Sequence, residues 1–160
     1  MKRLVTLILL VSIFSGCNGP DAGKIIDKSI AFYNMDKLSD ATLEFKFRTA
    51  SFKVMQKGGQ FKYERFFTDS TGNIHDILSN EGFKRILDDK ELVLDQKESD
   101  KYRQSLNAVV YFLYLPLKLK DASVVKKYLE EIQIKGKKYH KIEISFEKSK
   151  ESGDHRDVFY

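Results

Sequence analysis

Hydrophobic and polar residues alternate along the middle of the chain in the way that a half-buried β-strand requires. The clearest case is Thr42–Thr49, in which Leu43, Phe45 and Phe47 share one side and charged residues occupy the other. Successive side chains of a strand point to opposite faces of a sheet. This stretch therefore predicts a strand with one dry face and one solvated face.

The same period recurs in further stretches that are separated by turn-forming residues. Phe61, Tyr63 and Phe67 are in phase with one another, and the pair Gly58-Gly59 before them is typical of a hairpin turn. The other predicted strands are residues 51–56, 74–79, 83–88 and 91–95, the two sides of a turn at 135–137 within 128–148, and a final one that begins at 155–160 after Gly153.

Two stretches have the period of a helix instead. In Asp21–Asn34 the apolar residues fall on one stripe, with Asp21 as the expected N-cap and Asn34 as the expected end. A second helix is predicted from a cap at Ser99 to Pro116, which cannot continue a helix. Its last part, Ala108–Leu117, is apolar on every side, so we expect it to be buried or to line a cavity.

This order of elements predicts an α+β fold. Hairpins with one dry face must curl or be covered to hide that face, and two helices are the only available cover. We expect a strongly curved antiparallel sheet, a half-barrel, with an N-terminal helix and one inserted apolar helix packed on its concave face. Residues 21–160 form one domain in this interpretation, and we expect further strands after Tyr160, because the chain stops within a predicted strand.

The N-terminus has the composition of a secretory signal peptide. Lys2 and Arg3 precede an uncharged apolar run, Leu4–Phe14, and the small residues Ser15 and Gly16 follow it. A helix that spans a membrane needs about 20 apolar residues, so the run is too short for that role. Residues 1–16 are therefore the predicted signal peptide, which is removed on export.

The only cysteine of the chain follows directly. Phe14-Ser15-Gly16-Cys17 resembles the lipobox of bacterial lipoproteins. The resemblance implies that the Cys17 thiol carries a diacylglycerol, that residues 17–20 form a lipidated cysteine and its tether, and that the protein is anchored in the cell envelope, in the outer membrane facing the periplasm. An ordinary signal peptide beside an unrelated cysteine is the alternative. A single thiol has no partner for an internal disulfide.

Charge and polar motifs exclude several classes of function. Removal of Lys2 and Arg3 lowers the net charge from +5 to +3, which is too little to indicate a nucleic-acid partner. The three histidines, His75, His140 and His155, have no metal-binding spacing. Neighbouring carboxylates on a strand point to opposite faces, so the acidic pairs 88–89, 98/100 and 130–131 do not build a catalytic dyad. We expect no catalytic residue, no metal and no cofactor.

A second resemblance concerns the folded domain. The helix, the long antiparallel strands and the inserted apolar helix resemble the lipoprotein carriers and receptors of Gram-negative bacteria (LolA/LolB-like). The chain is also similar to small lipoproteins of Bacteroidota, on the turn Gly136–Tyr139 and on the aromatic segment Tyr111–Pro116. The resemblance implies a concave face that holds acyl chains, and it supplies no catalytic residue.

The aromatic residues are the candidate binding site. The chain has twelve Phe and eight Tyr, and an incompletely filled half-barrel offers an apolar cleft. Plain core packing is the alternative role for each of them. The expected function is a non-enzymatic envelope lipoprotein that binds an acyl chain or another apolar molecule; the alternatives are a structural or regulatory lipoprotein with a protein partner and an enzyme of unrecognised chemistry. The candidate cleft residues are Phe45, Phe47, Phe61, Tyr63, Tyr111, Phe112 and Tyr114.

Overall fold

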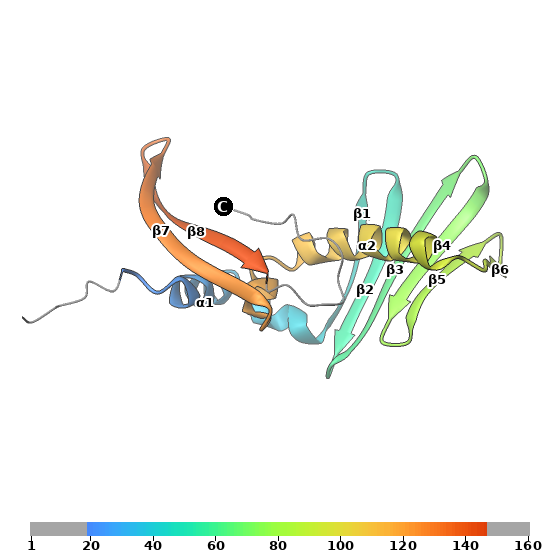
Figure 1. Cartoon of the computed structure of the whole chain (residues 1–160), viewed down its shortest axis with the longest axis horizontal. Coiled ribbons are helices and arrows are strands. Elements are labelled where there is room, and N and C mark those ends of the chain that lie inside the picture. Colours follow the sequence, from blue (N-terminus) through green and yellow to red (C-terminus); the bar gives the residue numbers. More distant parts are fainter. Residues whose placement is uncertain (1–18, 147–160) are drawn as a thin grey trace, which may run out of the picture.

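A computed structural model describes residues 19–146 as an α+β fold (Figure 1). The predicted signal peptide, Cys17, His155 and the predicted strand at 155–160 lie outside these residues. The helices are α1 (Ala22–Phe32) and α2 (Gln96–Leu113), with short 3₁₀ segments η1 (Met35–Asp40) and η2 (Leu117–Lys120). The strands are β1 (Ala41–Phe47), β2 (Ala50–Lys57), β3 (Gln60–Asp69), β4 (Gly72–Ser79), β5 (Gly82–Leu87), β6 (Lys90–Glu91), β7 (Val124–Ile134) and β8 (Lys137–Phe146).

Every strand pairs antiparallel with its neighbour in the sequence. Strands β1 to β6 form one sheet in that order, with β1 and β6 at its edges, so the described sheet is not closed into a barrel. We expected the later strands to extend the same sheet. Instead β7 and β8 form a separate two-stranded sheet, and Figure 1 shows it at the opposite end of the molecule, beyond α2.

The predicted hairpin turn between β2 and β3 sets the pairing register of these two strands. Gly58 and Gly59 both have positive φ angles, 54° and 80°. A two-residue hairpin turn of this kind matches the right-handed twist of its strands, and glycine adopts it without a steric cost. The turn fixes the partner of each following residue, so that Val54 pairs with Tyr63.

Helix α1 begins and ends as its sequence predicts, but it packs elsewhere. The Asp21 carboxylate caps it by accepting hydrogen bonds from the amides of Gly23 (2.8 Å) and Lys24 (3.2 Å). Its buried side packs against the β7–β8 hairpin and not against the six-stranded sheet. The cluster consists of Ile26, Ile30, Val124 and Ile144.

Helix α2 begins earlier than expected. Its N-cap is Asp95, whose carboxylate accepts from the Glu98 amide at 2.8 Å, and not Ser99. The predicted strand at 91–95 is wrong for the same reason, since the chain leaves β6 at Glu91 to enter this cap. The helix ends at Leu113, before the cis peptide bond between Leu115 and Pro116.

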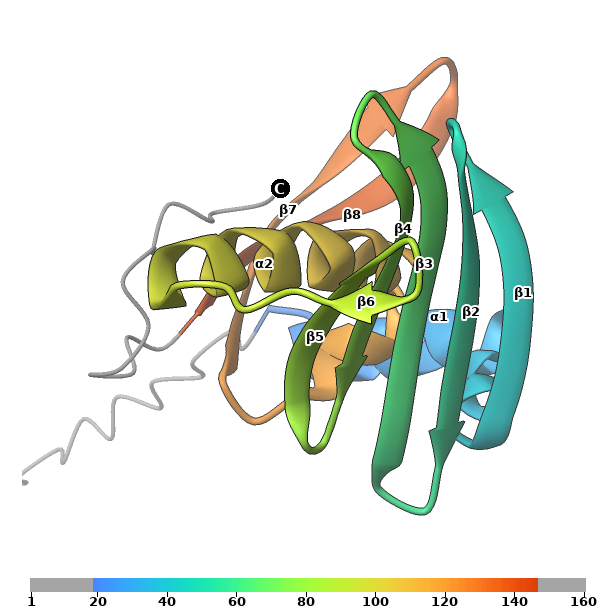
Figure 2. The same ribbon diagram turned by 90° about the vertical axis from the view of Figure 1, so that its right-hand side faces the viewer.

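Helix α2 lies across one face of the six-stranded sheet (Figure 2). Leu106, Val110 and Tyr114 pack there against a cluster of sheet residues, which are Phe52, Val54, Tyr63 and Leu78. The segment that is apolar on every side is not fully buried, because Phe112 is 57% exposed. Leu117 in η2 contacts this core and also the core under α1, so it joins the two halves of the molecule.

No helix within residues 19–146 is both long enough and apolar enough to cross a membrane.

Candidate functional site

The pairing register brings most aromatic residues of β1, β2 and β3 onto one face, and Phe66 of β3 lies on the other. Phe45 pairs with Phe52, and their rings stack with centroids 5.0 Å apart. Phe61 and Tyr63 lie on the same side of β3, with ring centroids 4.9 Å apart. This is the face on which α2 lies, so the sheet and the helix share one aromatic layer.

The seven candidate residues do not all meet in that layer. Tyr63 and Tyr114 are buried in the core between α2 and the sheet, and Phe45 and Phe61 pack against it. Phe47 is 46% exposed at the end of β1, and Phe112 is exposed on α2. Tyr111 points toward the other sheet, with its ring centroid 6.1 Å from that of Phe146 in β8.

The Tyr114 hydroxyl is the unusual group of the apolar layer. The side chain has an exposed fraction of 0%, and its Oη makes no hydrogen bond to any described residue. By contrast, the Tyr63 Oη accepts a hydrogen bond of 2.7 Å from Gln56 Nε2. Burial raises the pKa of Tyr114, and the neighbouring Tyr63 raises it further. A buried hydroxyl without a partner costs about 1–3 kcal/mol of stability.

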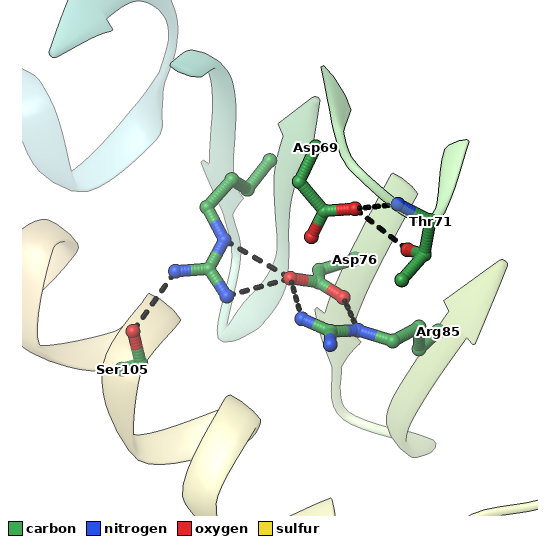
Figure 3. Close-up of polar contacts among 6 residues, drawn as sticks. Asp69, Thr71, Asp76, Arg85 and Ser105 are labelled. Atoms are coloured by element: carbon green, nitrogen blue, oxygen red, sulfur yellow. Dashed lines mark hydrogen bonds and ion pairs between the residues drawn. The ribbon is translucent and has the colours of Figure 1, made fainter. Parts of the chain in front are cut away.

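A buried ionic network lies on the same face, under the first half of α2 (Figure 3). Asp76 is fully buried and accepts hydrogen bonds from two guanidinium groups. Arg65 donates from Nε (3.0 Å) and from a terminal nitrogen (2.6 Å), and Arg85 donates from Nε (2.6 Å) and from a terminal nitrogen (2.9 Å). Arg85 thus binds both carboxylate oxygens in a bidentate pair, which is the strongest geometry, whereas both nitrogens of Arg65 donate to the single oxygen Oδ2.

The network also contacts the helix. Arg65 donates to the Ser105 hydroxyl at 2.9 Å (Figure 3), and the Arg85 guanidinium lies 3.3 Å from the centre of the Tyr102 ring. Burial lowers the pKa of Arg85, but the hydrogen bonds and the charge of Asp76 outweigh burial and raise it. Arg85 therefore stays charged, and both arginines connect the sheet to α2.

Sequence reasoning missed this network, although a signal for it exists. Arg65 is in phase with Tyr63 and Phe67 on the dry face of its strand, and Asp76 and Arg85 occupy the same phase of β4 and β5. Three charges in the dry phase of three neighbouring strands predict an internal ionic cluster, because a buried charge needs a partner.

The described histidines, His75 and His140, lie outside the aromatic layer, and His75 lines an open hollow together with Asp88 and Asp89. His75 lies on the opposite face of the sheet, where its Nε2 is 3.1 Å from a Glu64 oxygen and its ring stacks on Phe66. His140 lies beside Tyr128 on the β7–β8 hairpin. Among residues 19–146 no group of three or more His, Cys, Asp or Glu side chains is placed to hold a metal ion.

The acidic pairs that the sequence contains lie apart from the aromatic layer. Asp88 and Asp89 form the turn between β5 and β6, and they line an open hollow of about 750 Å³ at the ends of the strands. Glu130 and Glu131 contact Lys141 and Lys138 across the β7–β8 hairpin, at 3.4 Å and 2.8 Å.

Comparison with known proteins gives one family. No curated protein and no solved structure matches the chain. Residues 2–160 match the model of a family that is described as a family of unknown function, DUF6503. The match extends over nearly the whole sequence, and the chain therefore belongs to the DUF6503 family.

Proposed function

We propose that the protein is an exported, non-enzymatic lipoprotein of the cell envelope, anchored through a lipid on Cys17 in the outer membrane and facing the periplasm. The support is the order of the first 17 residues: two basic residues, an uncharged apolar run, Ser15-Gly16 and the only cysteine. Two or more acyl chains on one residue hold a domain stably on a membrane, because each buried methylene contributes about 0.8 kcal/mol.

Metabolic labelling tests the anchor directly. Cells that express the full chain are grown with labelled palmitate, and the protein is isolated and counted. We expect label on the wild-type chain and none on Cys17→Ser. Label on the serine variant contradicts the lipid attachment, and an unlabelled wild type supports the ordinary signal peptide instead.

The same proposal gives the domain a ligand, an acyl chain or another apolar molecule held between α2 and the sheet. In this proposal the six-stranded sheet is a half-barrel, and α2 covers its concave face. The observation that carries the proposal is the Tyr114 hydroxyl, which is buried among apolar side chains and lacks a partner in the described chain. An ester or carboxyl group at the head of an acyl chain would accept a hydrogen bond from it.

The ligand takes over contacts that α2 makes with the sheet. The aromatic layer supplies apolar area, at about 25 cal/mol for each Å² removed from water. The ionic network lies closer to the start of α2. There it holds the helix on the sheet through the contacts of Arg65 with Ser105 and of Arg85 with Tyr102. The end of the helix, with Val110 and the C-cap residue Tyr114, is held by apolar contacts that an acyl chain can replace.

Titration of the purified chain with a fluorescent fatty acid tests the ligand. We expect saturable binding that weakens by about 2- to 12-fold in Tyr114→Phe, the value of one net hydrogen bond. Phe45→Asp adds a charge to a ring that packs against this layer and should weaken binding too. Val125→Asp, at an exposed position of the β7–β8 hairpin, is the control.

The outcome separates two functions. If the folded protein, checked by circular dichroism, shows no saturable binding, the acyl ligand is excluded. The alternative, an envelope lipoprotein that acts through a protein partner, then becomes the leading hypothesis.

A further inference from the structure

The turn of the β7–β8 hairpin combines exposed apolar side chains with positive charge. Ile134 and Tyr139 are 48% and 46% exposed. Between Ile132 and Tyr139 the chain contains three lysines and no carboxylate. Tyr139 pairs with Ile132, and Ile134 pairs with Lys137, so these four side chains share one face of the hairpin. The lysines are Lys135, Lys137 and Lys138, of which Lys138 also pairs with the Glu131 carboxylate at 2.8 Å and would exchange that partner for a lipid phosphate.

This composition suits one kind of surface. A tyrosine ring is apolar with a polar tip and is enriched where hydrocarbon meets water. Lysine stems cover apolar surface while their ammonium groups stay in water. An anionic lipid surface attracts each nearby lysine strongly enough to raise binding about fivefold.

The chain that leads to the proposed anchor also passes beside the hairpin. The backbone at Gly19 passes close to Tyr128, since a Cβ built on Gly19 would lie 3.6 Å from the Tyr128 Cδ1. Cys17 is two residues earlier, so an extended chain places it within about 7 Å of Gly19. Tyr128 is six residues from Ile134, or about 20 Å along a strand.

The arrangement of the molecule agrees with this placement. Figure 1 shows α1 and the hairpin at one end and the six-stranded sheet at the other. In both Figure 1 and Figure 2 the β7–β8 turn is the highest point of the coloured ribbon. A lipid on Cys17 and the hairpin turn can therefore reach one membrane surface together, while the sheet under α2 stays away from it.

We propose that the β7–β8 turn is a second membrane contact, in which Ile134 and Tyr139 enter the interface of an anionic bilayer and the three lysines bind its phosphate groups. The inference rests on the proposed anchor. It gives the domain a fixed orientation, because an anchor and a second contact together define how the molecule stands on the surface.

The absence of tryptophan from the chain allows a direct test. Tyr139→Trp gives the full chain a single indole at the turn, and Val125→Trp gives a matched control. Val125 is 44% exposed and lies at the other end of the same hairpin. Each variant is placed on vesicles of phosphatidylethanolamine and phosphatidylglycerol, and emission is recorded with and without lipids brominated on their acyl chains.

We expect a blue shift and quenching by brominated lipid for the indole of Tyr139→Trp, and neither for the indole of Val125→Trp. Replacement of the three lysines by glutamine in the Tyr139→Trp chain should lower the fraction of indole that is inserted, with up to about 100-fold loss in its equilibrium constant from three factors of five. High salt should act in the same direction. Vesicles of phosphatidylcholine alone should give a smaller shift.

The intact mass of each sample reports the lipid on Cys17 separately. A lipidated Tyr139→Trp chain whose indole stays in water overturns this inference and leaves the anchor standing. A Tyr139→Trp chain without lipid whose indole still enters anionic vesicles removes the anchor and retains the hairpin contact. Indole signals that respond alike to the vesicles in Tyr139→Trp and Val125→Trp also overturn the inference.

Discussion

Removal of the Tyr114 hydroxyl should make the free protein more stable. Tyr114→Phe keeps the ring that packs against α2 and the sheet and deletes only an oxygen that has no hydrogen-bond partner in the described chain. A buried polar group without a partner costs about 1–3 kcal/mol. Part of this gain is offset by the small void that the oxygen leaves, so we expect a net increase of about 1 kcal/mol in the free energy of unfolding.

Urea unfolding followed by circular dichroism measures this change. With an m-value of about 1–3 kcal/mol per molar urea, a gain of 1 kcal/mol moves the midpoint up by roughly 0.3–1 M. The slope should not change, because both variants expose the same surface on unfolding.

Tyr63→Phe is the matched control. It deletes the same atom from a neighbouring buried tyrosine, but this hydroxyl accepts a hydrogen bond from Gln56. Its loss should lower the free energy of unfolding by about 1 kcal/mol. The reasoning fails if Tyr114→Phe lowers the midpoint at an unchanged slope, or if the two variants shift it in the same direction.

Three further predictions concern the buried ionic network and the aromatic layer between α2 and the sheet. Asp76→Asn leaves two buried guanidinium groups without a counter-charge and should cost about 3–5 kcal/mol in urea unfolding; a loss below about 1 kcal/mol would contradict the network's role. Leu106→Ala should cost about 2–5 kcal/mol, whereas Phe112→Ala, at an exposed site, should cost about 0.5 kcal/mol or less. Burial raises the pKa of both Tyr63 and Tyr114 above the value near 10 of an unfolded chain, so the free energy of unfolding is unaffected by their titration below pH 10 and falls as pH rises through their folded values. The double phenylalanine variant should lose less stability above pH 10 than the wild type, and equal losses would refute this assignment.

Strands β1 to β5 of the large sheet could be predicted because their signals are local. Alternation gives the two faces, and a turn such as Gly58-Gly59 sets the register. Once the register is fixed, the phase of Arg65, Asp76 and Arg85 gives the ionic network as well. The network could therefore have been found by looking for charged residues in the buried phase of neighbouring strands.

The partners of the helices could not be predicted in the same way. An amphipathic stripe shows that a face is buried, but not against which sheet, and α1 packs on the β7–β8 hairpin. The start of α2 was ambiguous because Asp95 and Ser99 are both good caps. The Tyr114 hydroxyl has no sequence signature, since its environment is built from β2, β3, β4 and α2 together.

The meander order of the large sheet also determines the order in which the molecule is completed during the proposed export. Each of β1 to β6 pairs with its sequence neighbour, so every pairing closes only a short loop, which favours rapid formation. An exported chain emerges from the membrane beginning with its N-terminal part, and all six strands precede α2 along the chain. Val54 and Tyr63 therefore remain uncovered until Leu106 and Val110 have emerged. During that interval the chain presents an aromatic surface to chaperones, and the arrival of a single helix ends the exposure.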